Sequence, residues 1–239
     1  MRPLPLLLLV IALMPAAAGA EEAVARVRSG SASLQVPVRS VLDFKRSGVV
    51  MQGFDYSCGA ASMATLLSYG VDDPVDEAWI LKTVMDAANE GERALLTQKG
   101  LSLLDLQRIA EKRGHKAQGF RIGADQLAKL TRPVIVYIKP KGYEHFAVLK
   151  GVRGDRAYLA DPSHGNVRMP LYRFFDMWAD EKGRGVVFAV ERRDGKWPDA
   201  SMLGITASAG PQLEQLTARE LYDFGRLYPL TFPNSTRVR

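Results

Sequence analysis

A single cysteine, Cys58, is the feature that most constrains how this chain of 239 residues can fold. One cysteine cannot form an internal disulfide, so the fold has to be held together by a buried apolar core. The composition allows such a core, because 47% of the residues are hydrophobic and 24% are charged. The net charge is +6, but the basic residues are scattered in pairs, without interleaved aromatic residues or metal-ligand spacing. We therefore expect no nucleic-acid partner, no metal and no cofactor.

Residues 1–20 have the pattern of a secretory signal peptide. Arg2 supplies the positive end, the apolar run from Leu4 to Met14 is too short to span a bilayer, and small residues lead to Ala20. We expect cleavage near Ala20, a periplasmic location and no stable membrane anchor, with a retained N-terminal anchor as the alternative. A lone exported thiol is a liability unless it is buried, paired between chains or used chemically, so Cys58 needs a role.

Helix signals gather early in the chain and strand signals late, which predicts an α+β domain rather than a parallel doubly wound sheet. We expect a flexible lead-in and a first strand in residues 21–39, with the strand beginning at Leu34 and running to Val41. Ser102 and Asp105 resemble a capping box, which predicts the start of a helix. The helices are predicted at about 59–69, 74–88, 102–114 and 170–180, and the strands at 133–138, 145–151, 155–161 and 185–191.

A turn-rich stretch after Arg193 predicts a boundary. The main domain is therefore expected at 40–192. The extension at 193–239 contains one predicted amphipathic helix, at about 211–226.

Cys58 directly precedes a predicted helix, where unpaired backbone N–H groups and the positive end of the helix dipole favour a thiolate. Gly59 helps to keep the first turn slim, so that a substrate backbone can come close. Gln52 lies six residues upstream. Its amide would reach back beside the Cys58 backbone N–H and supply a second donor for an oxyanion. The alternative is a buried cysteine that acts as a small hydrophobe.

His145 is the histidine expected to act with Cys58. A hairpin with a three-residue loop, Val152–Gly154, places His145 directly opposite Asp161 on one face of the sheet. The carboxylate would orient the imidazole and stabilise its charged form. A slip of one residue would move the two side chains to opposite faces, and an ordinary strand histidine near an Asp-Pro turn is the alternative. His115 is expected on the surface, and His164 in a loop.

Three segments together resemble the double-glycine leader peptidases, which process bacteriocin precursors: residues 52–61, 145–149 and 161–162. The resemblance covers roughly residues 40–192. It implies a papain-like cysteine peptidase fold, with N-terminal helices packed on a C-terminal antiparallel sheet. By this resemblance Cys58 is the nucleophile, His145 the general base and acid, Asp161 the residue that orients the histidine, and Gln52 the oxyanion residue. Substrate contacts are expected at Gly59, Tyr56 and Glu144.

The sequence resembles stand-alone exported members of this family most, including the peptidase-like proteins of functional-amyloid secretion operons. We expect a signal of its own and no transporter segment, and Ser57 stands where the family usually has an acidic residue. We expect an exported cysteine endopeptidase that cleaves a secreted protein or leader peptide in the biogenesis of an amyloid-type fibre. An outer-membrane secretion protein is a further expected partner. The alternatives are a catalytically silent peptide-binding helper and an acyl transferase that uses the same triad.

Overall fold

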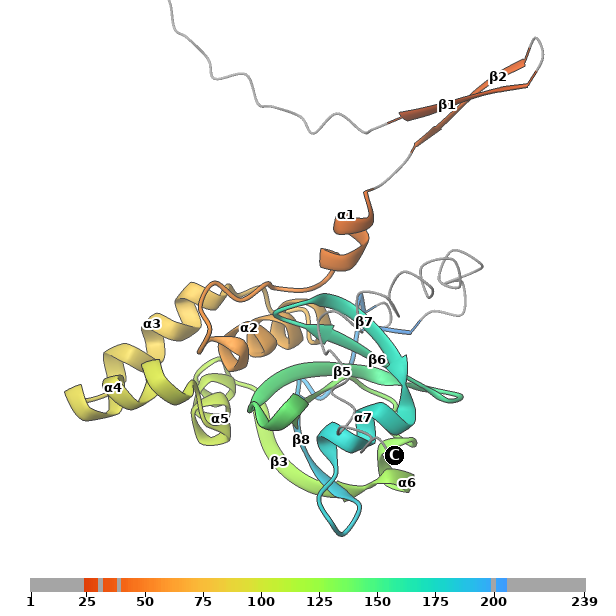
Figure 1. The fold of residues 1–239 in the computed structure, drawn as a ribbon. Coiled ribbons are helices and arrows are strands. Elements are labelled where there is room, and N and C mark those ends of the chain that lie inside the picture. The colour runs from red at the N-terminus through yellow and green to blue at the C-terminus, as the bar shows by residue number, and fades with distance from the viewer. Residues whose placement is uncertain (1–23, 30–31, 38–39, 199–200, 206–239) are drawn as a thin grey trace, which may run out of the picture. The chain divides into compact units, whose positions relative to one another are not determined.

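The computed structural model describes residues 24–29, 32–37, 40–198 and 201–205 (Figure 1). The chain divides into two compact units, the first ending at Val41 and the second beginning at Leu42, and each is described by itself. The predicted signal peptide and the predicted helix at 211–226 lie outside the described residues.

The first unit contains an antiparallel pair of strands, β1 (Val24–Ser29) and β2 (Ala32–Pro37). Two predictions need correction here. The strand expected from Leu34 to Val41 begins at Ala32 and ends at Pro37, and the segment expected to be a flexible lead-in contains β1. The physical reason is pairing, because all six residues of β1 face a partner on β2, whereas the prediction treated the segment alone.

The second unit begins with helices, as predicted. The helices expected near 59–69, 74–88, 102–114 and 170–180 are observed as α2 with η1, α3, α5 and α7, while α1, α4 and α6 were not predicted. The helical segments are α1 (Val41–Arg46), α2 (Cys58–Thr65), the π-helical turn η1 (Leu66–Gly70), α3 (Glu77–Ala87), α4 (Glu90–Lys99), α5 (Leu103–Lys112), α6 (Ala124–Leu127), the 3-10 turn η2 (Pro140–Gly142) and α7 (Leu171–Trp178).

One antiparallel sheet of six strands follows, in the order β3-β8-β4-β5-β6-β7. The predicted α+β class, with helices packed on a later antiparallel sheet, is confirmed, although β3 and β7 were not predicted. The strands are β3 (Lys116–Gly123), β4 (Val134–Ile138), β5 (His145–Arg153), β6 (Arg156–Asp161), β7 (Gly165–Pro170) and β8 (Arg184–Glu191).

The central strands are apolar on both sides because helices cover both faces of the sheet (Figure 1). On β5, Phe146 and Val148 belong to the core that contains α2, α3 and α5. The alternate residues Ala147 and Leu149 belong to the second core, which contains Phe174 and the rest of the buried face of α7. Since side chains alternate along a strand, a strand covered on both faces needs a continuous apolar run.

His115 is buried, although it was expected on the surface. Only 3% of it is exposed, its Nε2 lies 3.0 Å from Asp73 Oδ2, and its Nδ1 accepts a hydrogen bond from the backbone N–H of Arg193. The guanidinium of Arg113 binds the same carboxylate. Gly114, which follows α5 and has a positive φ, therefore turns the chain inward. The hydrogen bonds to Asp73 and Arg193 satisfy the buried imidazole of His115.

The extension predicted from residue 193 includes described residues that pack against the core of the second unit. Leu203 is fully buried in the core that contains α2, and the Ser201 hydroxyl donates to the carbonyl oxygen of Tyr69. The Arg153 guanidinium donates to the carbonyl oxygen of Ile205. Across the described part of the chain, no helix combines the length and the hydropathy needed to cross a membrane.

The turn that joins β6 and β7 depends on Gly165. Its φ is +78°, and a Cβ there would lie 2.2 Å from the backbone oxygen of Lys45. The next residue, Asn166, donates from its side-chain amide to the carbonyl oxygens of Phe44 and Ser47. This close approach fastens the end of α1 to the strand that follows Asp161.

We predict that Gly165→Ala destabilises the protein much more than Gly154→Ala. Both glycines have positive φ, but a Cβ at Gly154 would meet no atom within 4 Å. Gly154→Ala should cost only the strain of a left-handed residue, about 1 kcal/mol. Gly165→Ala should cost about 2 kcal/mol more because of the clash. Urea unfolding of both variants measures the difference, and equal losses would mean that the Lys45 contact does not form.

Candidate active site

Cys58 is the first residue of α2, whereas the sequence placed it directly before a helix that begins at Gly59, and it is 8% exposed. The loop before it is folded by the buried Ser57, whose hydroxyl donates to the carbonyl oxygen of Phe54 at 2.7 Å and accepts from the Phe54 N–H at 3.0 Å. The N–H of Gly53 donates to the carboxylate of Glu77 on α3. As the first residue of a helix, Cys58 has a backbone N–H that no carbonyl of that helix accepts.

Helix α2 brings Cys58 to the start of β5. All eight residues of α2 are buried, and one turn after Cys58 the Ser62 hydroxyl donates to the carbonyl oxygen of Phe146 at 3.0 Å. Phe146 directly follows His145, which is paired with Ile138 on β4. The cysteine at the start of α2 and the histidine at the start of β5 are therefore held close together, and Cys58 helps to raise the pKa of His145.

His145 and Asp161 are in contact, but the predicted hairpin register is wrong. The loop between β5 and β6 has two residues rather than three, and β5 bulges at Lys150. Beyond the bulge Val148 pairs with Ala160, so Asp161 stands opposite residue 147 and lies diagonally from His145. Without the bulge the register would differ by one residue, and the two side chains would lie on opposite faces. The bulge restores the predicted contact, with His145 Nε2 3.2 Å from Asp161 Oδ1.

The Asp161 carboxylate is 3% exposed and is surrounded by donors. Its Oδ1 accepts from the backbone N–H groups of Ser163 at 2.8 Å and His164 at 3.1 Å. The ring of His164 also approaches it, with Nδ1 at 3.3 Å, so this loop residue belongs to the site. Burial works against the charge of Asp161, but hydrogen bonds from His145 and His164 outweigh it and lower the pKa.

His145 is held in its charged form by the same contacts. Burial alone would lower its pKa, but the hydrogen bonds with Asp161 and with Cys58 raise the pKa of His145 to about 9. Because Nε2 faces Asp161, Nδ1 is the ring nitrogen left for the sulfur. The arrangement can therefore hold a proton on the imidazole beside the cysteine.

Gln52 is fixed on the loop that precedes Cys58. Its backbone N–H donates to the carbonyl oxygen of Pro162 at 2.9 Å, and its side-chain Nε2 donates to the carbonyl oxygen of Phe54 at 3.0 Å. Its Oε1 accepts from the Ser163 hydroxyl at 2.8 Å.

Sequence reasoning missed Ser163 and His164 as parts of the site. The Asp-Pro-Ser sequence at the end of β6 is a turn signal that could have directed attention to them.

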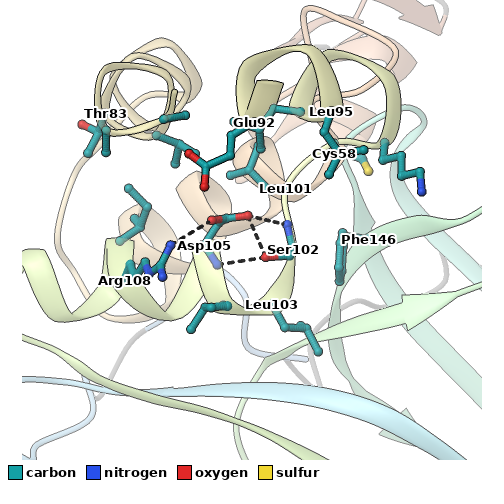
Figure 2. A pocket seen from close by; sticks show the side chains of 18 of the residues that line it. Cys58, Thr83, Glu92, Leu95, Leu101, Ser102, Leu103, Asp105, Arg108 and Phe146 are labelled. Atoms are coloured by element: carbon teal, nitrogen blue, oxygen red, sulfur yellow. Dashed lines mark hydrogen bonds and ion pairs between the residues drawn. The ribbon is translucent and has the colours of Figure 1, made fainter. Parts of the chain in front are cut away.

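A pocket of about 920 Å³ opens from Cys58. Figure 2 shows Cys58 and Phe146 at one side of this pocket, with Thr83 and Arg108 toward the other. Most of its lining is apolar and comes from α3, α4 and α5 on one side and from Tyr137 and Phe146 of the sheet on the other. Leu95 and Leu104 on its rim are 52% and 54% exposed, so apolar surface continues outward.

The three predicted substrate contacts lie in different environments. Glu144 lines the pocket and pairs with Lys139 at 3.3 Å, while a hydrogen bond from Tyr137 lowers its pKa. A Cβ at Gly59 would lie 3.3 Å from the Leu101 Cβ and 3.4 Å from the ring of Phe146, so side chains that line the pocket cover the slim first turn.

Tyr56 stacks on Phe54, with ring centroids 5.4 Å apart, and packs against the core. Tyr143, which was not predicted, reaches across from the loop before β5, and its hydroxyl donates to the carbonyl oxygen of Asp55 at 3.0 Å. Its ring centroid lies 6.5 Å from that of His145. The loop before Cys58 and the loop before His145 are thus joined directly.

The family model described as "Peptidase C39 family" matches residues 46–182. A Pseudomonas aeruginosa protein named "Probable functional amyloid protease FapD" is 36% identical over 153 residues, 64% of each chain. The protein of that name from Pseudomonas fluorescens is 35% identical over 161 residues, 67% of this chain and 68% of the relative. The chain thus spans about two thirds of the length of these relatives.

Among solved structures, one is titled as a double glycine motif protease from an AMS/PCAT transporter in complex with the leader peptide. It is 27% identical and covers 59% of this chain and 89% of its own, with a TM-score of 0.44.

We predict that His145 makes stability depend on pH on the alkaline side. Its pKa rises from 6.5 to about 9 on folding, so it contributes stability that is fully present below about pH 6.5 and is lost as the pH rises through about 9. The free energy of unfolding of the wild type, minus that of His145→Gln, should therefore fall across this range. Urea unfolding at about pH 6, 8 and 10 measures it, and a constant difference would contradict the raised pKa.

Proposed function

The chain belongs to the peptidase C39 family, whose model matches residues 46–182, and we propose that it is a cysteine endopeptidase with Cys58, His145 and Asp161 as its catalytic triad. One observation carries the proposal. A buried imidazole lies between the cysteine at a helix start and a carboxylate whose pKa is lowered, at one side of an apolar pocket. This is the arrangement that thiol nucleophiles require.

In the proposed reaction the proton of the Cys58 thiol passes to His145 before the substrate is attacked, which leaves His145 in its charged form, and the sulfur then attacks the carbonyl carbon of the scissile peptide bond. His145 then gives this proton to the nitrogen of the leaving amine, and an acyl-enzyme forms. Water, deprotonated by His145, hydrolyses the thioester and restores the thiol. Asp161 keeps its negative charge throughout and stabilises the imidazolium that forms at each step.

The oxyanion is proposed to lie between the backbone N–H of Cys58 and the side-chain amide of Gln52. The first donor is free of helix bonding because Cys58 begins α2. The second has two hydrogens on Nε2, of which one is given to the carbonyl oxygen of Phe54. The other hydrogen is available for negative charge that develops in the transition state.

The pocket supports a peptide as the substrate. Its lining is mainly apolar, and its charged side chains stand apart from Cys58 in sequence and carry both signs: Glu92, Lys99, Asp105, Arg108, Lys112 and Glu144. Such a surface suits an amphipathic or extended segment with apolar anchors. A secreted protein or a leader peptide is therefore the proposed substrate class.

The names of the relatives support a role in the biogenesis of amyloid fibres. Two of them, about one third identical, are named probable functional amyloid proteases. We place this chain in the biogenesis of an extracellular amyloid-type fibre, in the periplasm after removal of a signal near Ala20, together with an outer-membrane secretion protein. The motivation for the location is the signal-like pattern of residues 1–20.

We predict that Cys58→Ala abolishes cleavage and leaves the fold intact, because the nucleophile is lost while only one small buried group is removed. The test compares the masses of exported fibre proteins from cells with the wild type and with the variant, and the circular dichroism of both purified proteins. Iodoacetamide should label the native wild type at this single cysteine.

Two outcomes would sink the peptidase proposal. One is a fibre protein that is cleaved to the same extent in cells with Cys58→Ala as in cells with the wild type. The other is a native wild type that binds the precursor peptide without cleaving it, which would favour the peptide-binding helper.

We predict that His145→Ala and Asp161→Asn have non-additive effects on kcat, because the two side chains act through one hydrogen bond, 3.2 Å long. His145→Ala should remove nearly all activity. Asp161→Asn should cost less, since an amide can still hold the ring but stabilises the imidazolium poorly. The double variant should be scarcely slower than His145→Ala alone in single-turnover peptide hydrolysis. Additive losses in this cycle would separate the two residues functionally.

A further inference from the structure

The turn after β6 contacts the carboxylate and the proposed oxyanion residue at the same time. The backbone N–H of Ser163 donates to Asp161 Oδ1 at 2.8 Å, while its hydroxyl donates to Gln52 Oε1 at 2.8 Å. The preceding carbonyl, of Pro162, accepts the backbone N–H of Gln52 at 2.9 Å. Ser163 thus joins Gln52 and Asp161, two parts of the site that are 109 residues apart in sequence.

The contacts of the Gln52 amide determine which way it points. The carbonyl oxygen of Phe54 can only accept, so the NH₂ group of Gln52 must face it, at 3.0 Å. Oε1 then faces Ser163, where a hydroxyl is available to donate. With both ends of the amide bonded, the second hydrogen of Nε2 has a fixed direction. Rotation of the amide would break both hydrogen bonds.

Resting on the proposed peptidase function, we propose that Ser163 is a positioning residue for Gln52. Its hydroxyl orients the amide that stabilises the oxyanion, and its backbone N–H holds the carboxylate that orients His145. The side chain therefore acts on the transition state and not on the thiol. This separation makes its role measurable, because Ser163→Ala removes only the hydroxyl and keeps the backbone bond to Asp161.

Ser163→Ala should lower kcat by about 3- to 10-fold, the usual effect of one neutral hydrogen bond, with KM nearly unchanged. Affinity for a substrate-derived peptide aldehyde should fall by the same factor, because its hemithioacetal oxygen occupies the oxyanion position. The rate of alkylation by iodoacetamide should not change, since that reaction develops no oxyanion. Ser163→Thr keeps a hydroxyl and should restore most of kcat.

Gln52→Ala provides the epistasis test. It should lower kcat by about 10²- to 10³-fold, and adding Ser163→Ala should then have little further effect. Thr97→Ala is the matched control, because it removes an exposed hydroxyl that donates only to carbonyl oxygens of its own helix. This control variant should match the wild type in each assay.

The outcomes separate the two proposals. A wild type that hydrolyses the peptide while Ser163→Ala keeps full kcat and full aldehyde affinity overturns the role of Ser163 alone. A slower alkylation of Ser163→Ala also overturns it, because the side chain would then act on the thiol or on the fold. A wild type that neither cleaves the peptide nor binds the aldehyde overturns the peptidase function, and the role of Ser163 falls with it.

Discussion

The contact between α2 and β5 is the constraint on which the rest of the site depends. The Ser62 hydroxyl and the carbonyl oxygen of Phe146 form a hydrogen bond inside the core, where breaking it would leave two buried polar groups without partners. Cys58 lies one turn before Ser62, and His145 lies one residue before Phe146. A helix that is buried on all sides cannot rotate to move its first residue, so the position of the sulfur relative to the ring is set by packing.

The other half of the site is built at the ends of elements and held by a turn. Asp161 ends β6, and Gly165 begins β7 directly opposite it. In the tight turn between them, two backbone N–H groups donate to the carboxylate, and the Ser163 hydroxyl donates to Gln52. Asn166 fastens this turn to the segment that leads into the loop of Gln52. Loops therefore carry the polar groups, while the sheet and α2 fix where those loops begin and end.

The sequence was enough to identify the pair His145 and Asp161 but not the way in which they meet. Pairing rules for a three-residue loop placed them opposite each other, whereas a two-residue loop and a bulge at Lys150 place them diagonally. A bulge depends on what packs around the strand: a Cβ at the adjacent Gly151 would lie 2.8 Å from Ile205 Cδ1, which comes from the far end of the described chain. Local pattern holds no information about such a contact.

The errors at other positions have the same cause. The position of His115 after a helix-ending glycine suggested a surface residue, because nothing nearby in the sequence indicates Asp73, 42 residues upstream. By contrast, α5 was predicted because its capping box is local, with Ser102 and Asp105 bonded to each other as expected. The missed helix α4 has a similar local signal in Asn89 and Glu92 that was available and not used.

The buried pair of His145 and Asp161 is a costly way to stabilise a fold. Both groups lose hydration, and a pair of apolar residues of the same volume is often equal or better for stability. The surrounding core shows that this chain builds apolar packing readily, since most of the buried residues of α2 and β5 have small, aliphatic or aromatic side chains. The charged pair of His145 and Asp161 is better explained by its effect on the neighbouring Cys58. It keeps a proton donor beside the one cysteine of the chain, at the side of an apolar pocket of about 920 Å³.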